Sequence, residues 1–298
     1  MAQLEIYQHS GRLGMGLVVV PLLGIIAAVP LGIAYNYADV YIPVGGPVIS
    51  SVLALVVGAL VGLAVSGGAL VSKCRNTKFV ILIGVVCGFI ALYSAWASFT
   101  YVLVHRTADE PVDLSLVSVF SRPDLVWKFA ADINEEGWFS LRSVTPKGTF
   151  LWIIWGCEAI IFLGLAPLTA IGLISERVFC ETSEQWCEKK EKVASLCLTE
   201  DKQLIDRIAD GDINALAELP PHDGSDSPRF EVDIHQSPDE LGTRAMRVRV
   251  VLLKEDAKDG SDVVSKDVTP FYVLSKEQFE RITALAHREP QVESTLES

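Results

Sequence analysis

The chain has 298 residues, of which 50% are hydrophobic and 21% are charged, and its mean hydropathy is +0.36. Soluble chains usually have about a quarter charged residues, so this composition argues against a single soluble globular domain. With 14 Pro and 6 Cys it also excludes collagen-like, disulfide-rich and wholly disordered proteins. The net charge of −12 is uneven: residues 1–175 have 9 basic and 10 acidic side chains, whereas residues 176–298 have 16 and 27. This asymmetry predicts a membrane domain followed by an acidic soluble domain, which we expect to bind no nucleic acid.

Four long runs with almost no charged residue predict four transmembrane helices. Each run exceeds the roughly 20 apolar residues that cross a hydrocarbon core as a helix. The first run is too long for the apolar core of a cleaved leader, so we expect it to span the lipid bilayer too. The expected fold is an α-helical membrane bundle over 14–175, with an N-terminal segment 1–13, an extracytoplasmic loop 104–148 and spans at about 14–35, 48–70, 79–103 and 149–174.

Basic residues near the spans predict the orientation. The short second loop contains Lys73, Arg75 and Lys78, whereas the first loop, 36–46, contains no Lys or Arg. By the positive-inside rule the second loop is cytoplasmic, and four spans then place both termini in the cytoplasm. The loop 104–148 has basic residues of its own, which weakens the rule here. None of the six cysteines falls in a predicted outer loop, as expected for reduced thiols without disulfides.

Small residues recur at helical spacing in three of the predicted spans. They allow helix backbones to approach closely, so that van der Waals contact can hold helices together in lipid. Two explanations are open: packing within one four-helix bundle, or self-association into a homo-oligomer. The residues concerned are Ser50, Ala54, Gly58, Gly62 and Ser66 in the second span, Gly24, Ala28 and Gly32 in the first, and Gly84 and Gly88 in the third.

Glu158 is a charged residue inside a predicted span. It lies about 13 Å from the start of the fourth helix at 1.5 Å per residue, near the middle of the membrane. A carboxyl group at that depth is costly and therefore marks a functional hypothesis. Three explanations are open: a hydrogen bond to a Ser or Thr of a neighbouring helix, a proton or cation relay, and contact with a partner helix. A relay needs a second polar group, and Ser94, Ser98 and Thr100 of the third span are available for it.

The acidic part is predicted to be a small α+β cytoplasmic domain. We expect a helical segment over 176–219, a linker over 220–228, the α+β domain over 229–288 and a disordered tail over 289–298. Apolar and polar residues alternate in 230–234 and 246–250, which predicts two strands with one face in water. Ser275 followed by Gln278 matches a capping box and predicts the start of a last helix.

Sequence motifs for catalysis are lacking. The chain has no Walker-type phosphate loop, no HExxH and no GxSxG. Cys180, Cys187 and Cys197 are spaced too widely for the paired ligands of a zinc knuckle. We therefore expect no enzyme, no metal and no cofactor.

Three stretches resemble an uncharacterised family of multi-span bacterial membrane proteins. They are 7–12 (YQHSGR), 41–43 (YIP) and 155–159 (WGCEA). The resemblance covers mainly residues 1–190 and implies a bacterial inner membrane. Members often carry a Phe-Cys-x-x-Cys pair after the last span, but here Cys180 is followed by Ser183 in the second place, so any function of that pair is lost. The family implies no function for this chain.

Two functions from different classes follow. The first is a membrane anchor or assembly component without catalysis, whose acidic domain binds an unknown cytoplasmic protein. The alternative is a small oligomeric transporter or channel subunit that uses Glu158. The separate acidic domain favours the first. The absence of Lys, Arg and His from the span cores weakens the second.

Overall fold

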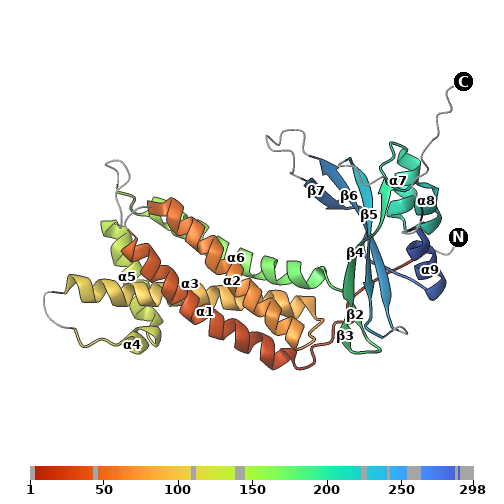
Figure 1. The fold of residues 1–298 in the computed structure, drawn as a ribbon. Coiled ribbons are helices and arrows are strands. Elements are labelled where there is room, and N and C mark those ends of the chain that lie inside the picture. The colour runs from red at the N-terminus through yellow and green to blue at the C-terminus, as the bar shows by residue number, and fades with distance from the viewer. Residues whose placement is uncertain are drawn as a thin grey trace, which may run out of the picture. The chain divides into compact units, whose positions relative to one another are not determined.

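A computed structural model describes residues 4–42, 46–108, 112–137, 145–222, 227–239, 242–253, 263–285 and 288. The chain divides into two compact units (Figure 1). The helical unit is Ser10–Glu176, and the sheet unit combines Met1–His9 with Arg177–Ser298. Both ends of the chain therefore belong to the same unit, although the whole helical unit separates them in sequence.

Four long helices form the helical unit, as the sequence predicted. All four are long and apolar enough to cross a membrane. The first continues to Tyr41, six residues beyond its predicted end, so that Asp39 belongs to the helix rather than to a loop. The helices are α1 (Gly16–Tyr41), α2 (Gly46–Val71), α3 (Thr77–Thr107) and α6 (Thr149–Ser175).

The packing of α6 on α2 shows that these two helices run in the same direction. α1 and α6 each pack against both α2 and α3. A Cβ added at Gly58 would lie 3.2 Å from the Leu165 Cβ, and one at Gly62 would lie 2.5 Å from the Ala166 carbonyl oxygen. The contacting residue numbers rise together along α2 and α6, which makes the two helices parallel.

The α2–α3 loop lies at the end of the bundle where α1 begins. The Arg75 N–H donates to the Arg12 carbonyl at 2.9 Å, and the Asn76 side chain donates to the Gly11 carbonyl at 3.0 Å. Since α6 runs parallel to α2, α6 also ends there. The chain therefore enters α1 and leaves α6 at one end of the bundle, the end that carries the loop between α2 and α3.

Two short helices occupy part of the segment between α3 and α6. They are α4 (Leu116–Phe120) and α5 (Pro123–Glu136), and both pack against α3. The Tyr93 hydroxyl donates to the Phe120 carbonyl at 2.8 Å. α5 ends at Gly137, whose φ of +91° suits glycine. The loop predicted over 104–148 is therefore partly folded onto the bundle.

The sheet unit is built on an antiparallel sheet of order β1–β8–β6–β5–β4, with β7 also paired to β6. A separate hairpin of β2 (Phe179–Cys180) and β3 (Gln185–Trp186) precedes β4. The strands of the sheet are β1 (Glu5–Ile6), β4 (Glu188–Cys197), β5 (Arg229–Gln236), β6 (Arg244–Leu253), β7 (Val263–Asp267) and β8 (Tyr272–Val273).

Three helices cover one face of this sheet: α7 (Lys202–Ala209), α8 (Ile213–Glu218) and α9 (Lys276–Leu285) (Figure 1). The predicted capping box is confirmed at α9, because the Ser275 N–H donates to the Gln278 side chain (2.8 Å) and the Gln278 N–H donates to the Ser275 hydroxyl (3.2 Å). The core between sheet and helices includes Leu196, Phe230, Val232, Ile234, Ile208, Leu216 and Ile282.

The helical segment predicted over 176–219 is wrong in its first half. Residues 179–197 form β2, β3 and β4, and helices appear only from Lys202 onward. The Glu, Lys and Ala residues of 188–194 have helix propensity, but pairing with β5 overrides it. Burial of Ala194 and Leu196, two positions apart, is the alternation expected of a strand.

The strands predicted over 230–234 and 246–250 are confirmed, but the face assigned to water is buried. Glu231, Asp233 and His235 are 3%, 0% and 1% exposed. Opposite charges face one another across the ladder, since Glu231 is paired with Arg249 and Asp233 with Arg247. The alternation in sequence therefore correctly distinguished an apolar face of the sheet from a charged face, but both faces are buried.

Candidate functional site

A polar contact crosses the interior of the helical bundle. The Tyr35 hydroxyl on α1 donates to a carboxylate oxygen of Glu158 on α6. α1 and α6 each pack on both α2 and α3, so this bond links helices on opposite sides of the bundle. Tyr35 is 6% exposed, and its ring packs edge-on against Phe162 at 5.3 Å. The partner of Glu158 is thus Tyr35, a buried tyrosine at the last residue of the first predicted span.

A second carboxylate lies one helical turn from Tyr35. Asp39 is at position i+4 on α1, so it shares a face with Tyr35. It accepts a hydrogen bond from the Ser50 hydroxyl on α2. Tyr35, Asp39, Ser50 and Glu158 thus bring two carboxyl groups and two hydroxyl groups from α1, α2 and α6 into one region of the bundle. Groups of this kind can hold a proton or a small cation.

The hydroxyl groups expected to serve Glu158 have other partners. Ser94, Ser98 and Thr100 are buried, and each donates to a carbonyl of its own helix at 2.7 to 3.0 Å. These bonds satisfy the hydroxyl groups within α3. The described hydrogen bonds of these three hydroxyl groups therefore stay within α3, whereas the described bond of Glu158 is to Tyr35.

The small residues predicted for helix packing lie between helices of the same chain. An added Cβ would approach a backbone carbonyl oxygen of a neighbouring helix at Gly32 (2.1 Å), Gly62 (2.5 Å) and Gly88 (2.5 Å). Gly24, Gly58 and Gly84 also face close neighbours, whereas Ala28, Ala54 and Ser66 are buried and Ser50 bonds to Asp39. These faces pack the helices of one bundle against each other. A second copy of the chain could contact them only if the helices of this bundle separated.

A network of buried charges lies on the second face of the sheet. The Asp233 carboxylate forms ion pairs with Arg249 at 2.8 Å and with Lys189 at 3.7 Å. It also accepts a hydrogen bond from the backbone N–H of Lys192 at 3.1 Å. Glu231 pairs with Arg229 at 2.9 Å. Buried carboxylates need such partners, because an unpaired charge is costly to desolvate. These charged groups therefore pair with one another.

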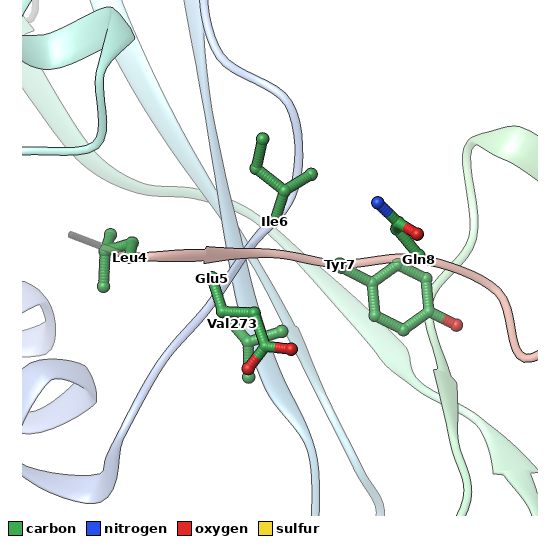
Figure 2. Close-up of a pocket in the computed structure, with 6 residues that line it drawn as sticks. All are labelled: Leu4, Glu5, Ile6, Tyr7, Gln8 and Val273. Atoms are coloured by element: carbon green, nitrogen blue, oxygen red, sulfur yellow. The ribbon is translucent and has the colours of Figure 1, made fainter.

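An open hollow of about 600 Å³ lies along β1. Its lining comes almost wholly from the N-terminal segment, whose side chains point alternately to either side of the strand in Figure 2. β1 ends the order of the sheet and pairs with β8. The Tyr7 hydroxyl accepts the Phe179 N–H at 2.9 Å, which holds the segment against the β2–β3 hairpin. The sequence predicted no structure for residues 1–13, so this strand was missed.

Comparison with known proteins finds no matching family model, no similar curated protein and no similar solved structure.

Proposed function

We propose that the chain is a multi-pass membrane protein that anchors a small acidic docking domain at the cytoplasmic face, a role that requires no catalytic step. The observation that supports this most is the division of the chain: the sheet unit is assembled from both ends of the sequence, and the helical unit is the segment between them. Two connections, before α1 and after α6, join the two units, and both leave the helical unit at the same end. An anchor gains from two attachments, since they restrict how far the domain can move.

The proposed orientation rests on the end of the bundle at which these connections lie. That end carries the α2–α3 loop with Lys73, Arg75 and Lys78. Basic residues next to spans favour the cytoplasmic side. We therefore propose that both termini and the sheet unit are cytoplasmic, in the bacterial inner membrane that the sequence resemblance implies.

The chemistry of the domain favours a partner with a positively charged surface. Residues 176–298 have a net charge of −11. The anionic lipid surface repels such a domain, whereas a basic protein surface attracts it. The end of the sheet at β1, with the hollow beside it, is a place where a partner could dock.

The test is capture of partners from a membrane extract in mild detergent, with a tag after Ser298. We expect a partner that binds the full chain, dissociates at high salt and is absent with a chain that ends at Glu176, the boundary of the helical unit. Glu158→Gln in the full chain is the control and should retain the partner. Partners shared equally by both chains, or no partner at all, would contradict the docking proposal.

The Tyr35–Glu158 contact, with Asp39 nearby, favours one alternative: a transporter or channel subunit for protons or small cations. Purified protein in liposomes distinguishes the two functions. An anchor is expected to give no cation or proton flux above that of empty liposomes. If flux occurs and Glu158→Gln abolishes it, while Gly164→Ala on the same helix leaves it intact, transport replaces the anchor as the function.

A further inference from the structure

Two loops of the sheet unit place hydrogen-bond donors around the sulfur of Cys180. The turn between β2 and β3 supplies the Ser183 hydroxyl and N–H, and the loop between β5 and β6 supplies the Ser237 hydroxyl and the Thr243 N–H. The Thr243 nitrogen is 3.3 Å from the sulfur, and the two serine hydroxyl groups are 2.9 Å apart. Two backbone N–H groups and two hydroxyl groups therefore surround one sulfur atom, and the Ser237 hydroxyl also donates to the Asp239 carboxylate.

These donors determine the ionisation of Cys180. Burial raises the pKa of the thiol, but the hydrogen bonds from Ser183, Ser237 and Thr243 outweigh it and lower the pKa to about 6. A hydrogen-bonded sulfur of this kind is a thiolate at neutral pH, which is the nucleophilic form of cysteine.

A second thiol lies on the same face of the hairpin. Cys180 is paired with Gln185, and the Cys187 N–H donates to the Val178 carbonyl at 2.8 Å, so the two cysteines are diagonal neighbours across β2 and β3. The Cys187 sulfur lies 3.8 Å from the Thr243 carbonyl oxygen. Both thiols therefore contact the backbone of the same residue, one at its N–H and the other at its C=O.

Cys187 differs from Cys180 in its protonation. Burial raises the pKa of Cys187 to about 12, and the negative charges of Cys180 and Asp239 add to this rise. Cys187 is therefore a thiol at neutral pH, next to a thiolate. Both side chains are buried: Cys187 is 6% exposed and Cys180 is 0% exposed, whereas the turn that joins β2 to β3 is largely exposed.

We propose that Cys180 and Cys187 form a peroxide-reactive dithiol site, in which Cys180 attacks a small hydroperoxide and Cys187 resolves the product to a disulfide. Three features favour this chemistry: donors that stabilise a sulfur anion, a second thiol on the same face, and a hairpin with only two residues in each strand. Among the described residues no group of three ligands suited to a metal is present, so the two thiols lack the further ligands of a zinc site.

The reaction balances in two steps. The Cys180 thiolate attacks one peroxide oxygen, so that an S–O bond forms, the O–O bond breaks and the leaving alkoxide or hydroxide takes a proton from water. The Cys187 thiol then loses its proton and attacks the Cys180 sulfur. The S–S bond forms, the S–O bond breaks, and the hydroxyl group leaves with that proton as water. The dithiol loses two electrons and the peroxide gains them. A thiol reductant reverses the change, as expected of a transient cytosolic disulfide.

Disulfide formation requires a small movement of the hairpin. Diagonal residues on paired strands have Cα atoms about 7–8 Å apart, whereas disulfides usually span about 4.4–6.8 Å. β2 and β3 have two residues each, so few backbone bonds oppose the shift. The Thr243 contacts to both sulfurs must open at the same time. We therefore expect oxidation to alter the β5–β6 loop that holds Thr243.

The test uses the reduced full chain in detergent, treated with hydrogen peroxide, quenched with a thiol-blocking reagent and analysed by peptide mass spectrometry. We expect a Cys180–Cys187 disulfide that a thiol reductant reverses. Cys187→Ser should stop at a sulfenic acid on Cys180, which dimedone traps, and Cys180→Ser should leave Cys187 unreacted. Cys197→Ser is the matched control, since Cys197 lies elsewhere and contacts the Pro221 carbonyl at 3.6 Å, and should behave like the unaltered chain.

The donors provide a readout that a structural role would not affect. Combining Ser183→Ala with Ser237→Ala should slow oxidation of Cys180 at pH 7 by about tenfold or more and restore the rate near pH 9, because the thiolate then forms only at higher pH. The proposal is overturned if Cys180 reacts no faster than Cys197, or if the unaltered chain accumulates sulfenic or sulfinic acid without the disulfide. It does not depend on the anchor function, and either can fail alone.

Discussion

Replacing Gly32 with alanine should destabilise the helical bundle by about 3 kcal/mol or more, at the upper end of what overpacking costs. The added Cβ would lie 2.1 Å from the Ala91 carbonyl oxygen and 2.9 Å from the Ser94 Cβ, so the backbones of α1 and α3 must separate. Tyr35 is one turn further along α1, so the shift should also weaken its bond to Glu158. The measurement is reversible unfolding in detergent followed by circular dichroism.

Gly164→Ala on α6 is the matched control for this prediction. It makes the same chemical change in another long helix, but nothing lies within 4 Å of the added Cβ. We expect stability equal to that of the unaltered chain or higher by up to about 1 kcal/mol, since alanine favours a helix more than glycine does. Equal stability of the two variants would show that α1 and α3 do not pack as closely as described.

The sequence could predict the long helices because the requirement behind them is local. A span needs a run of apolar residues, and the four runs can be recognised without knowing their neighbours. The end of α1 was misplaced because the predicted first loop, 36–46, included the charged Asp39. In the structure a charged residue fits inside the helix, since Ser50 of α2 satisfies its carboxylate. Only the tertiary fold supplies that partner.

The features that the sequence did not reveal all depend on distant pairing. β1 has two residues, and it is a strand because Glu5 pairs with Val273 at the other end of the chain. Glu158 meets Tyr35 across the bundle, and Cys180 meets Thr243 across two loops. None of these pairs has a characteristic spacing in sequence. Taken singly, none of these residues indicates the partner that it has in the fold.

Replacing Asp233 with alanine should destabilise the sheet unit by about 3–5 kcal/mol, the usual cost of removing one partner from a buried ion pair. Asp233 is fully buried; it forms ion pairs with Arg249 and Lys189 and accepts a hydrogen bond from the Lys192 N–H. Without it, Arg249 remains on a covered face of the sheet with the more distant Glu231 at 3.9 Å. Thermal unfolding of the full chain, monitored through the strand signal in circular dichroism, measures the loss.

Two further variants separate the ion pair from a general effect of substitution. Glu280→Ala also removes a carboxylate from the sheet unit, but its 4.0 Å pair with Lys276 is exposed and should matter little. The double variant Asp233→Leu with Arg249→Met should recover most of the stability, because an apolar pair of similar volume avoids burying a charge. If it does not recover, the network is needed for specificity rather than for charge balance. If Asp233→Ala alone leaves the stability unchanged, water must reach this face of the sheet. The prediction from the sequence that this face lies in water would then be correct.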